Sequence, residues 1–539
     1  MPFLRQIAPL IFASAASISG CAFVDRRPDE MQCGSAIAFC RRGAEYQARG
    51  DVERAIKEYD QAIQLNPEAA HAFANRAEAY RTKGDIEQAL HDFDQAIKLG
   101  AKDADTFYGR GNTWSDQGNY DRAIDDFDQT IRLNPDFPEA FNSRGEALRK
   151  KGDTASAIRD YDQAIRLQPD FAWAFNNRGI AYRVRGDIDR AVLDYDEAIR
   201  LLPKFALAFS NRGIAYQEKG ETDRAIKDYD QALRLLPGHA GTFNNRGNAY
   251  HDKGDDDRAI QDYNEAIRLK PSDPNAFNNR GVAYKAKGDN DRAIQDFSEA
   301  IRLKPDYATA FNNRGSVFGA TEDNDRALQD YEEALRLRPN YASALHNRGR
   351  WYLQKGDLER AIQDYERAIQ TYDQAIRTDP KDSLAYFNRS VAQMLAGRTG
   401  AASGFRAMIE IVGWNGRRAT YSVILGYIAA RRDGDGVSAT QFLQDADGKL
   451  DEPWPYPAVR FLRGDIDDAA LLNLATDDAQ RTEAHCYVGF VSALSGRRAD
   501  AVAHHRWVRD HGKHNFYEYA LSLAELERLE RSTDGDSKP

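Results

Sequence analysis

The sequence has few cysteines, and none of them stands at the spacing of a metal site. Four occur among 539 residues: Cys21, Cys33, Cys40 and Cys486. No Cys-x-x-Cys pair is present, which argues against a structural zinc site. The chain also lacks an excess of positive charge, because its formal net charge is −10 and the two signs alternate along it. This balance argues against DNA or an anionic lipid surface as a partner.

Catalytic signatures are missing as well. The chain has no Gly-x-Ser-x-Gly, no His-Glu-x-x-His and no phosphate-binding loop. Histidines gather near the C-terminus, at His485, His504, His505, His511 and His514. His504 and His505 are adjacent and point in different directions on a helix, so they are poorly placed to ligate one metal ion together. We therefore expect no catalytic residue, no metal and no cofactor, and a protein that is not an enzyme.

A short apolar stretch lies at the N-terminus. Arg5 precedes residues 7–19, which carry no charge and lead into the motif Ser-Ile-Ser-Gly-Cys at 17–21. The stretch is too short for a transmembrane helix, which needs ~20 apolar residues, and it predicts a secretory signal over residues 1–20. The motif resembles the bacterial lipobox, which implies lipid attachment at Cys21 and anchoring by several acyl chains. An ordinary cleaved signal peptide with a chance cysteine is the alternative.

Residues 21–35 form the expected lipidated N-terminus and tether. Ala22, not aspartate, follows Cys21, which favours the outer membrane in cells of the enteric type. In an exported chain, Cys33 and Cys40 would meet an oxidising compartment. On one continuous helix their Cα atoms would lie ~10 Å apart, too far for a disulfide. Pairing therefore requires Cys33 to precede the helix, and two unpaired thiols are the alternative.

From residue 36 the sequence repeats every 34 residues. In residues 172–203 the recurring residues stand at repeat positions 4, 8, 11, 15, 20, 24, 27 and 32: Phe175, Gly179, Tyr182, Gly186, Ala191, Tyr195, Ala198 and Pro203. Small residues at positions 8, 20 and 27 let two helices approach closely, while aromatic residues fill the grooves between them. A Gly-Asp turn joins the helices, and proline ends the second one.

This eight-position pattern is similar to that of the tetratricopeptide-repeat family. The resemblance implies an all-α fold, a right-handed α-solenoid superhelix of helix pairs that bury their apolar faces only against neighbouring pairs. We expect about eleven repeats, followed by a divergent helical part with a last repeat-like unit and a capping helix.

The expected organisation has five parts. Residues 1–20 are the signal peptide and 21–35 the tether; 36–381 are a regular array of ten repeats with a long helix at 361–378; 382–481 are a degenerate repeat and a divergent helical region; 482–539 are a repeat-like unit, the capping helix and a loose tail. The long helix is predicted because Tyr365-Glu-Arg-Ala-Ile is echoed seven residues later by Tyr372-Asp-Gln-Ala-Ile. Seven residues are two helical turns, or ~10.5 Å.

The C-terminal part carries a second resemblance. The run His-Asn-Phe-Tyr-Glu-Tyr-Ala-Leu at 514–521, the helical region around 461–466 and the lipobox resemble the new lipoprotein I family. Members of that family are outer-membrane tetratricopeptide lipoproteins that act as adaptors for peptidoglycan hydrolases and their degrading protease. The resemblance implies a lipid-anchored place in the cell envelope, on the periplasmic side of the outer membrane. This chain has many more regular repeats than that family, so the partner is not carried over.

Asparagine recurs at repeat position 6, on the face of the first helix that lines the concave side of this architecture. The candidate partner-binding residues are Asn177, Asn211, Asn245, Asn279, Asn313 and Asn347. Asparagine is a poor residue inside a helix, so its recurrence needs a reason. Its amide donates and accepts hydrogen bonds, which suits gripping the backbone of an extended peptide. The alternative is that these amides bridge successive helices.

Arginine at position 7 and an acidic residue at position 23 recur together in ten units. Equal recurrence predicts a ladder of partly buried ion pairs between the two helices of each repeat. We expect this ladder to be structural, because buried pairs more often fix geometry than bind ligands. Its central members are Arg178 with Asp194, Arg212 with Asp228, and Arg246 with Asp262.

The expected function is that of a non-enzymatic protein–protein interaction scaffold or adaptor. It would be a lipid-anchored envelope lipoprotein that binds peptides or partner proteins, with no nucleic-acid partner. A cytosolic co-chaperone-type adaptor is the alternative, and it requires the N-terminal signal to be spurious. An enzyme activity would have to reside, unrecognised, in residues 398–539.

Overall fold

The structure is a computed structural model that describes residues 28–414, 416–450, 453–514 and 516–535. Within these ranges the chain forms 29 α-helices and no strand. Contacts divide it into two compact units, residues 1–253 and 254–539. The predicted signal over residues 1–20, the lipid attachment site Cys21 and the tether up to residue 27 lie outside the described residues.

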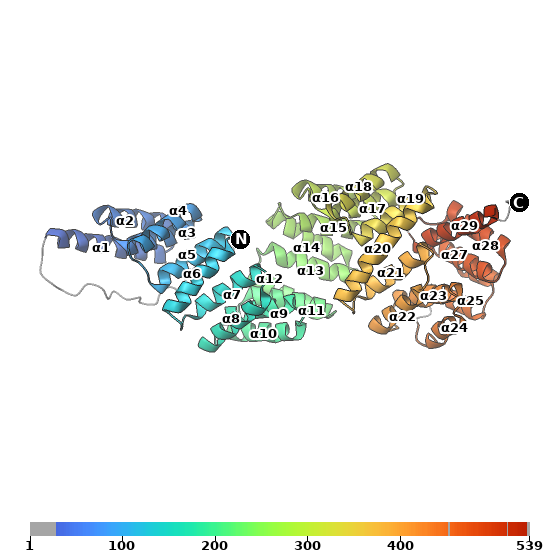
Figure 1. Ribbon diagram of the computed structural model, residues 1–539, viewed down its shortest axis with the longest axis horizontal. Coiled ribbons are helices and arrows are strands. Elements are labelled where there is room, and N and C mark those ends of the chain that lie inside the picture. The colour runs from blue at the N-terminus through green and yellow to red at the C-terminus, as the bar shows by residue number, and fades with distance from the viewer. Residues whose placement is uncertain (1–27, 415, 451–452, 515, 536–539) are drawn as a thin grey trace. The chain divides into compact units, whose positions relative to one another are not determined.

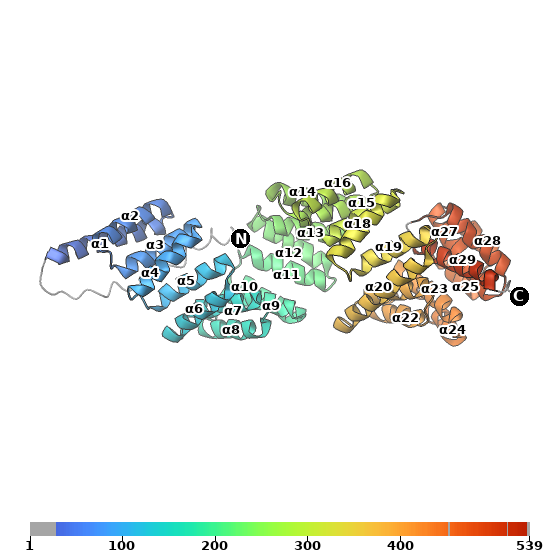
Figure 2. The ribbon, with the colours of Figure 1, turned by 45° about the horizontal axis from the view of Figure 1, so that its top comes forward.

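The first unit contains α1 to α13, which follow one another as antiparallel pairs (Figures 1 and 2). Their bounds are α1 Pro28–Ala48, α2 Val52–Leu65, α3 Ala70–Lys83, α4 Ile86–Lys98, α5 Ala104–Gln117, α6 Tyr120–Leu133, α7 Pro138–Lys150, α8 Thr154–Leu167, α9 Ala172–Val184, α10 Ile188–Leu201, α11 Ala206–Glu218, α12 Thr222–Leu235 and α13 Ala240–Asp252.

The second unit continues the pairs through α14 to α22 and then becomes less regular. Its bounds are α14 Asp256–Leu269, α15 Pro274–Ala286, α16 Asn290–Leu303, α17 Ala308–Ala320, α18 Asn324–Leu337, α19 Ala342–Gln354, α20 Leu358–Thr378, α21 Ser383–Leu395, α22 Ala401–Val412, α23 Arg417–Arg432, α24 Gly436–Asp445, α25 Tyr456–Arg463, α26 Asp468–Leu474, α27 Asp478–Leu494, α28 Arg498–His511 and α29 Tyr517–Gly535. The alternation of helix pairs gives the α-solenoid expected from the repeat, while the handedness of the superhelix stays a prediction.

The pair α9 and α10 shows how the repeat sequence builds one unit. Gly186 ends the turn after α9 with φ 82°, a conformation that glycine adopts without steric cost. The side chain of Asp187 then accepts a hydrogen bond from the backbone N–H of Arg190 and caps α10. At the other end, Leu202 is held away from helical geometry because it precedes Pro203.

Close packing between the two helices depends on glycine opposite an aromatic ring. Tyr195, Ala191 and Ala198 are fully buried. A Cβ added at Gly179 would stand 2.7 Å from Cε1 of Tyr195, nearer than two carbon atoms approach without a clash. The same contact recurs along the array, for example between Gly213 and the ring of Tyr229. Position 8 is therefore small because position 24 is aromatic.

Two departures from the repeat pattern are accommodated locally. Thr130 replaces the small alanine at position 27, and its hydroxyl donates to the carbonyl of Asp126 within the same helix. Glu322 replaces the turn glycine and adopts the left-handed conformation itself, with φ 63°. Helices α17 and α18 flank this turn as a normal pair, so the repeat continues through both departures.

The long helix α20 carries two copies of one motif, and each copy contacts a different repeat. In the regular repeats a single short second helix makes both sets of contacts. Its first copy of the echoed motif serves its own repeat, because Asp364 binds Arg348 and Tyr365 packs on Gly349. Its second copy serves the next repeat, because Asp373 binds Arg389 at 2.9 Å. Because seven residues make two helical turns, both copies of the motif lie on the same face of α20. The second copy lies ~10.5 Å further along the axis of α20.

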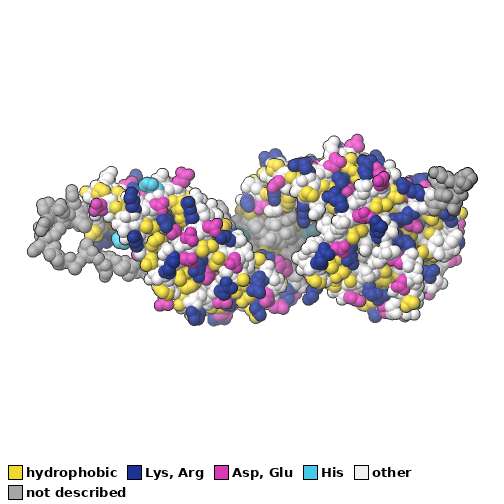
Figure 3. Space-filling model, in the orientation of Figure 1, with side chains coloured by type: hydrophobic (Ala, Val, Ile, Leu, Met, Phe, Trp, Pro, Cys, Tyr) yellow, Lys and Arg dark blue, Asp and Glu magenta, His cyan; other side chains and the backbone are white. Residues whose placement is uncertain are grey.

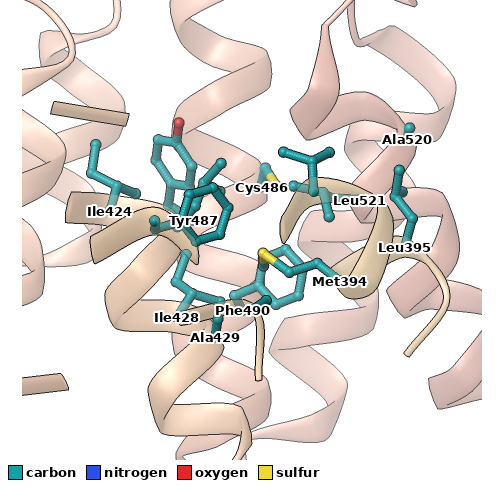
Figure 4. Close-up of a cluster of buried hydrophobic side chains, with 14 of the residues drawn as sticks. Met394, Leu395, Ile424, Ile428, Ala429, Cys486, Tyr487, Phe490, Ala520 and Leu521 are labelled. Atoms are coloured by element: carbon teal, nitrogen blue, oxygen red, sulfur yellow. The ribbon is translucent and has the colours of Figure 1, made fainter. Parts of the chain in front are cut away.

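The divergent C-terminal helices share one hydrophobic core. Figure 4 shows Met394 and Leu395 of α21 meeting side chains from α23, α27 and α29. Helix α27 begins at Asp478, before the start expected at residue 482. The last helix, α29, packs on α27 and α28 but also turns back onto α19 and α21. It is therefore more than the end cap that the sequence predicted, because it joins the C-terminal helices to the repeat array.

The surface agrees with the mixed charge of the sequence. Figure 3 shows lysine and arginine side chains interspersed with aspartate and glutamate on the visible face of each unit. No helix in the described part of the chain is long and apolar enough to cross a bilayer.

Candidate functional site

The position-6 asparagines donate to position-5 side chains of the preceding repeat. Nδ2 of Asn177 lies 3.0 Å from Oδ1 of Asn142, and Nδ2 of Asn211 lies 2.9 Å from Oδ1 of Asn176. The second unit repeats this arrangement: Asn313 donates to Asn278 at 3.1 Å, and Asn347 donates to Asn312 at 3.0 Å. The amides thus form a ladder across successive first helices, as the bridging alternative describes.

The ladder does not use up the hydrogen-bonding capacity of these amides. All six candidate residues, including Asn245 and Asn279, are half-buried. An asparagine amide has two N–H donors and one oxygen with two lone pairs. Each bond of the ladder takes one of these donors, so bridging and peptide binding are compatible on the same side chain. Partner binding at these residues stays a prediction.

The position-7 arginines tie each repeat to the one before it. Arg178 forms two parallel hydrogen bonds to Asp194, from Nε at 2.9 Å and from Nη2 at 2.7 Å. Its third group, Nη1, reaches Asp162 of the preceding repeat at 2.7 Å. Arg212 binds Asp228 and Asp196 in the same way. The sequence did not predict this second bond to Asp162, at repeat position 25. Aspartate recurs at that position, which is the signal that could have indicated it.

The surroundings of these arginines suit the structural role expected of the ladder, which stays a prediction. Asp194 is 6% exposed and Asp228 is 7% exposed. Burial by itself would lower the pKa of Arg178, but the hydrogen bonds to Asp194 and Asp162 raise it, so the guanidinium stays charged.

Of the third predicted pair, Arg246 belongs to the first compact unit and Asp262 to the second, so their pairing stays a prediction. Arg246 binds Asp230 at 2.6 Å inside the first unit, and Asp262 is buried in the second unit.

A pocket of about 420 Å³ opens beside the first two repeats. Ile37 and Cys40 of α1 and His71 and Asn75 of α3 line it, so it lies on first-helix positions 2, 5 and 6. Burial raises the pKa of the Cys40 thiol, which makes it a weak nucleophile. Helix α1 contains both Cys33 and Cys40, so the helix break that a disulfide between them requires is absent, and Cys40 is unpaired.

We call the side of the first helices that carries the position-6 asparagines the asparagine face, and helix α29 packs on it at α19 and α21. The ring of Tyr517 lies 5.8 Å from that of His346 on α19 and 5.9 Å from that of Phe387 on α21. Its hydroxyl lies 3.5 Å from Oδ1 of Asn388, a position-6 asparagine. At the other end, Arg528 donates to the carbonyl of Met394. The asparagine face is therefore closed by the chain itself at this point.

The C-terminal histidines pack against one another and do not assemble a metal site. Nδ1 of His485 lies 2.9 Å from Nδ1 of His504, and His485 stacks on Trp507 with ring centroids 3.8 Å apart. His505 is buried against Ser522. Burial lowers the pKa of His485 to about 4, so this ring is neutral at neutral pH. In the described ranges, no three metal-ligating side chains come together.

Two glutamates lie buried between the C-terminal helices. Glu483 is 2% exposed and accepts hydrogen bonds from Tyr421 and Trp454, both at 2.8 Å. Glu518 is 3% exposed and accepts from Tyr487 at 2.9 Å. Burial, followed by the charge of Glu518, raises the pKa of Glu483 to about 8. Burial therefore keeps this carboxyl group protonated at neutral pH, although the hydrogen bonds from Tyr421 and Trp454 favour the carboxylate.

Comparison with known proteins agrees with the repeat geometry. A family model for the TPR repeat matches residues 43–82, 145–183, 180–220, 247–288, 283–321 and 356–397. Three further models for the tetratricopeptide repeat match residues 306–374, residues 104–137 and 206–239, and residues 70–102. No curated protein matches the sequence.

Two of the solved structures that the chain resembles are described as tetratricopeptide-repeat proteins. One from Parabacteroides merdae ATCC 43184 is 19% identical with a TM-score of 0.39, over 47% of this chain and 97% of its own. MamA is 29% identical with a TM-score of 0.27, over 30% and 93%. YrrB, described as a TPR protein with an unusual peptide-binding site, is 26% identical with a TM-score of 0.29, over 36% and 97%. Because the family models together cover more than half of the chain, the protein belongs to the tetratricopeptide-repeat family of protein–protein interaction scaffolds.

Proposed function

We propose that this protein is a lipid-anchored adaptor of the cell envelope whose asparagine face holds an extended segment of a partner protein. The observation that supports it most is the regular spacing of half-buried amides along successive first helices. Within each compact unit, neighbouring first helices contact one another, so their position-6 side chains form a row. An adaptor needs such a surface because it must hold a partner without acting on it chemically.

The row of amides suits a peptide main chain better than a set of side chains. Every residue except proline offers one backbone N–H and one C=O. An asparagine amide that donates one N–H to its neighbour, as Asn211 does to Asn176, has a second N–H and an oxygen with two lone pairs to offer a main chain. Contacts of this kind recognise an extended backbone and are tolerant of its sequence, as expected of a scaffold.

The anchor rests on the sequence of the N-terminus. The signal stretch ends at the lipobox-like motif before Cys21, and several acyl chains on this residue would hold the protein stably at a membrane. Ala22 and the resemblance to the new lipoprotein I family favour the periplasmic side of the outer membrane. That family's partners, peptidoglycan hydrolases and an envelope protease, are the first partner classes to test.

Affinity purification from detergent-solubilised cells tests the adaptor function. The wild type is compared with a variant in which Asn211, Asn245 and Asn279 are all changed to alanine. The matched control removes three exposed amides from second helices of the repeats, with Gln261, Gln295 and Gln329 changed to alanine. We expect envelope proteins to co-purify with the wild type and the control but not with the asparagine variant.

Two results would contradict the proposal. If the asparagine variant retains its partners as well as the control does, the asparagine face is not the binding surface. If only cytosolic chaperones co-purify, the envelope location is wrong and the co-chaperone alternative replaces it. Circular dichroism of all three proteins shows that a lost partner does not reflect lost helix.

A further inference from the structure

The asparagine ladder is interrupted at the step from α19 to α21, and helix α29 fills the gap. In the regular repeats a position-6 amide donates directly to position 5 of the preceding repeat, as Asn347 of α19 does to Asn312. The next step would join Asn388 of α21 to His346 of α19. Tyr517 of α29 lies between them instead, with its hydroxyl 3.5 Å from Oδ1 of Asn388 and its ring 5.8 Å from that of His346. A side chain of the protein itself therefore occupies the asparagine face at this step.

The other side of α29 belongs to the C-terminal hydrophobic core. Ala520 and Leu521 of α29 are buried there together with Cys486 of α27, as Figure 4 shows. The thiol of Cys486 is inaccessible to solvent. Packing of α29 on α27 thus covers this thiol, and departure of α29 would uncover it.

The contact between α27 and α29 also contains two carboxyl groups. Glu483 of α27 accepts hydrogen bonds from Tyr421 and Trp454, and Glu518 of α29 accepts one from Tyr487. Burial raises the pKa of both carboxyl groups and outweighs these bonds, which favour the carboxylates. Two buried negative charges would also repel each other, so α29 docks most stably when both groups are protonated.

The charges around this pair change the balance little. Arg417 of α23 lowers the pKa of Glu483, but its side chain is exposed, so water screens its charge. The titratable and charged groups around the pair and the start of α29 are Arg417, Arg418 and Tyr421 on α23, Cys486 and Tyr487 on α27, Arg350 on α19, and Tyr517 and Glu525 on α29.

Two buried histidines contact α29 and act in the opposite direction. His346 meets the ring of Tyr517, and Nδ1 of His505 on α28 lies 3.1 Å from Oγ of Ser522. Burial lowers the pKa of each histidine to about 3, so docking of α29 loses stability as pH falls below 6.5. The glutamates lose stability as pH rises from 4.5 to 8. The two effects oppose each other up to pH 6.5, and above it the glutamates decide.

We propose that α29 is an autoinhibitory helix that covers the asparagine face at α19 and α21 in mildly acidic surroundings and leaves it in alkaline surroundings. The inference rests on the proposed function, because covering this face matters only if partners bind there. A helix docked in cis competes with a partner segment for the same amides. Alkaline pH and a bound partner therefore act together, since each favours the released state.

The native thiol of Cys486 reports on release of α29 in the full chain. Short pulses of iodoacetamide at pH 7 and pH 9, followed by mass spectrometry of the peptides, give its labelling relative to Cys40, a half-buried thiol of the first unit. We expect this ratio to rise roughly fivefold or more in the wild type. In Glu483→Gln with Glu518→Gln, which keeps an oxygen for each hydrogen bond but cannot ionise, the ratio should stay nearly constant.

Matched variants separate the buried pair from charge in general. Glu359→Gln with Glu410→Gln removes two exposed glutamates from α20 and α22 and should behave as the wild type does. Circular dichroism at both pH values checks that every variant keeps its helices. If the double variant of the buried pair loses helix, Glu518→Gln alone replaces it and should show a smaller rise than the wild type.

Partner capture tests the inhibition itself. The affinity purification described above is repeated at pH 7 and pH 9 with the wild type and the double variant of the buried pair. Any pH dependence of the partner is common to both proteins. Relative to the double variant, we expect the wild type to capture more of its envelope partners at pH 9 than at pH 7.

Two results would overturn the inference. An equal rise of Cys486 labelling in the wild type and the double variant would show that the buried pair does not control α29. Controlled release without a gain in partner capture would show that α29 does not inhibit binding. The proposed function fails separately, because retention of partners by the triple asparagine variant excludes the asparagine face whatever the labelling shows.

Discussion

Single arginine residues join neighbouring repeats into a continuous array. Arg178 donates hydrogen bonds from Nε and Nη2 to Asp194 and from Nη1 to Asp162. Asp194 is nearly inaccessible to water, whereas the side chain of Asp162 is half exposed. Removing one partner of a buried pair costs more than the pair contributes, because the remaining charge is left without compensation.

Asp194→Ala should lower the free energy of unfolding by about 3 kcal/mol, since Arg178 would remain buried with only its weaker partner, Asp162. Urea unfolding followed by far-UV circular dichroism measures the change. Glu197→Ala is the control, because Glu197 lies on the same helix and its pair with Arg200 is exposed. Equal urea midpoints for the two variants would show that the arginine ladder does not stabilise the array.

Among the elements, α20 decides how the C-terminal part is attached. Elsewhere neighbouring first helices such as α17 and α19 contact each other. At α20 the echoed motif lengthens the helix, and Tyr517 of α29 stands between rings of α19 and α21. A duplication within one helix thus makes room for another helix to enter the array.

Deletion of residues 366–372 should expel α29 from the array. The deletion joins Tyr365 to Asp373 and restores Asp-Tyr-Asp-Gln-Ala-Ile, the sequence that occurs at 160–165 in a regular repeat. Helix α21 would then stack directly on α19 and leave no room for Tyr517. Hydrogen exchange should show loss of protection over residues 517–531, while α16 in the same molecule keeps its protection. Unchanged protection of α29 would refute this account of the long helix.

The contact between α27 and α29 makes the stability of the C-terminal part depend on pH. Glu483 has a pKa of about 8 when folded and 4.5 ordinarily, so the folded state favours the protonated form. As pH rises from 4.5 to 8, the unfolded chain releases this proton first, and folding loses stability. Below pH 6.5 the buried neutral histidines oppose this trend, because His346 resists protonation.

Between pH 6.5 and 8, the free energy of unfolding of the C-terminal helices should fall by roughly 2 kcal/mol. Urea unfolding at both pH values, followed by the near-UV signal of Trp454, which bonds to Glu483, measures the change. Glu483→Gln removes the ionisable group and should make the stability nearly constant across this window. If Glu483→Gln keeps the full pH dependence of the free energy of unfolding, another group causes that dependence.

At the scale of the whole molecule, the proposed lipid attachment would decide which partners the protein can meet. The sequence places Cys21 at the end of the signal stretch, while the helices begin at Pro28. The segment between them is short. If Cys21 carries the proposed lipid, the six residues between it and Pro28 would keep the start of α1 within roughly 25 Å of the membrane, at ~3.5 Å per residue.

Cys21→Ser should move the protein from the membrane fraction to the soluble fraction, because serine does not accept the thioether-linked lipid. Fractionation and immunoblotting measure the distribution, and Cys40→Ser, which leaves the lipobox intact, is the control. An unchanged membrane fraction for Cys21→Ser would exclude lipid anchoring at this residue.

Much of the fold was predictable because it repeats. Each residue of a regular repeat meets the same neighbours 16 or 35 positions away, as Arg178 meets Asp194 and Asn177 meets Asn142. Recurrence therefore indicated the helix pairs, the close approach of Gly179 to Tyr195 and the arginine ladder. For the asparagines it indicated the row but could not choose between bridging and binding, because both use the same amide.

The sequence by itself determined the period and the helix pairs, since these depend on residues near one another in the chain. Only the tertiary structure placed Tyr517 against His346 and Glu483 near Glu518. Each of these contacts occurs once and joins distant parts of the chain, so no periodic pattern in the sequence predicts it. They depend on how whole helices pack, and packing is decided by the shapes and volumes of all the buried side chains together.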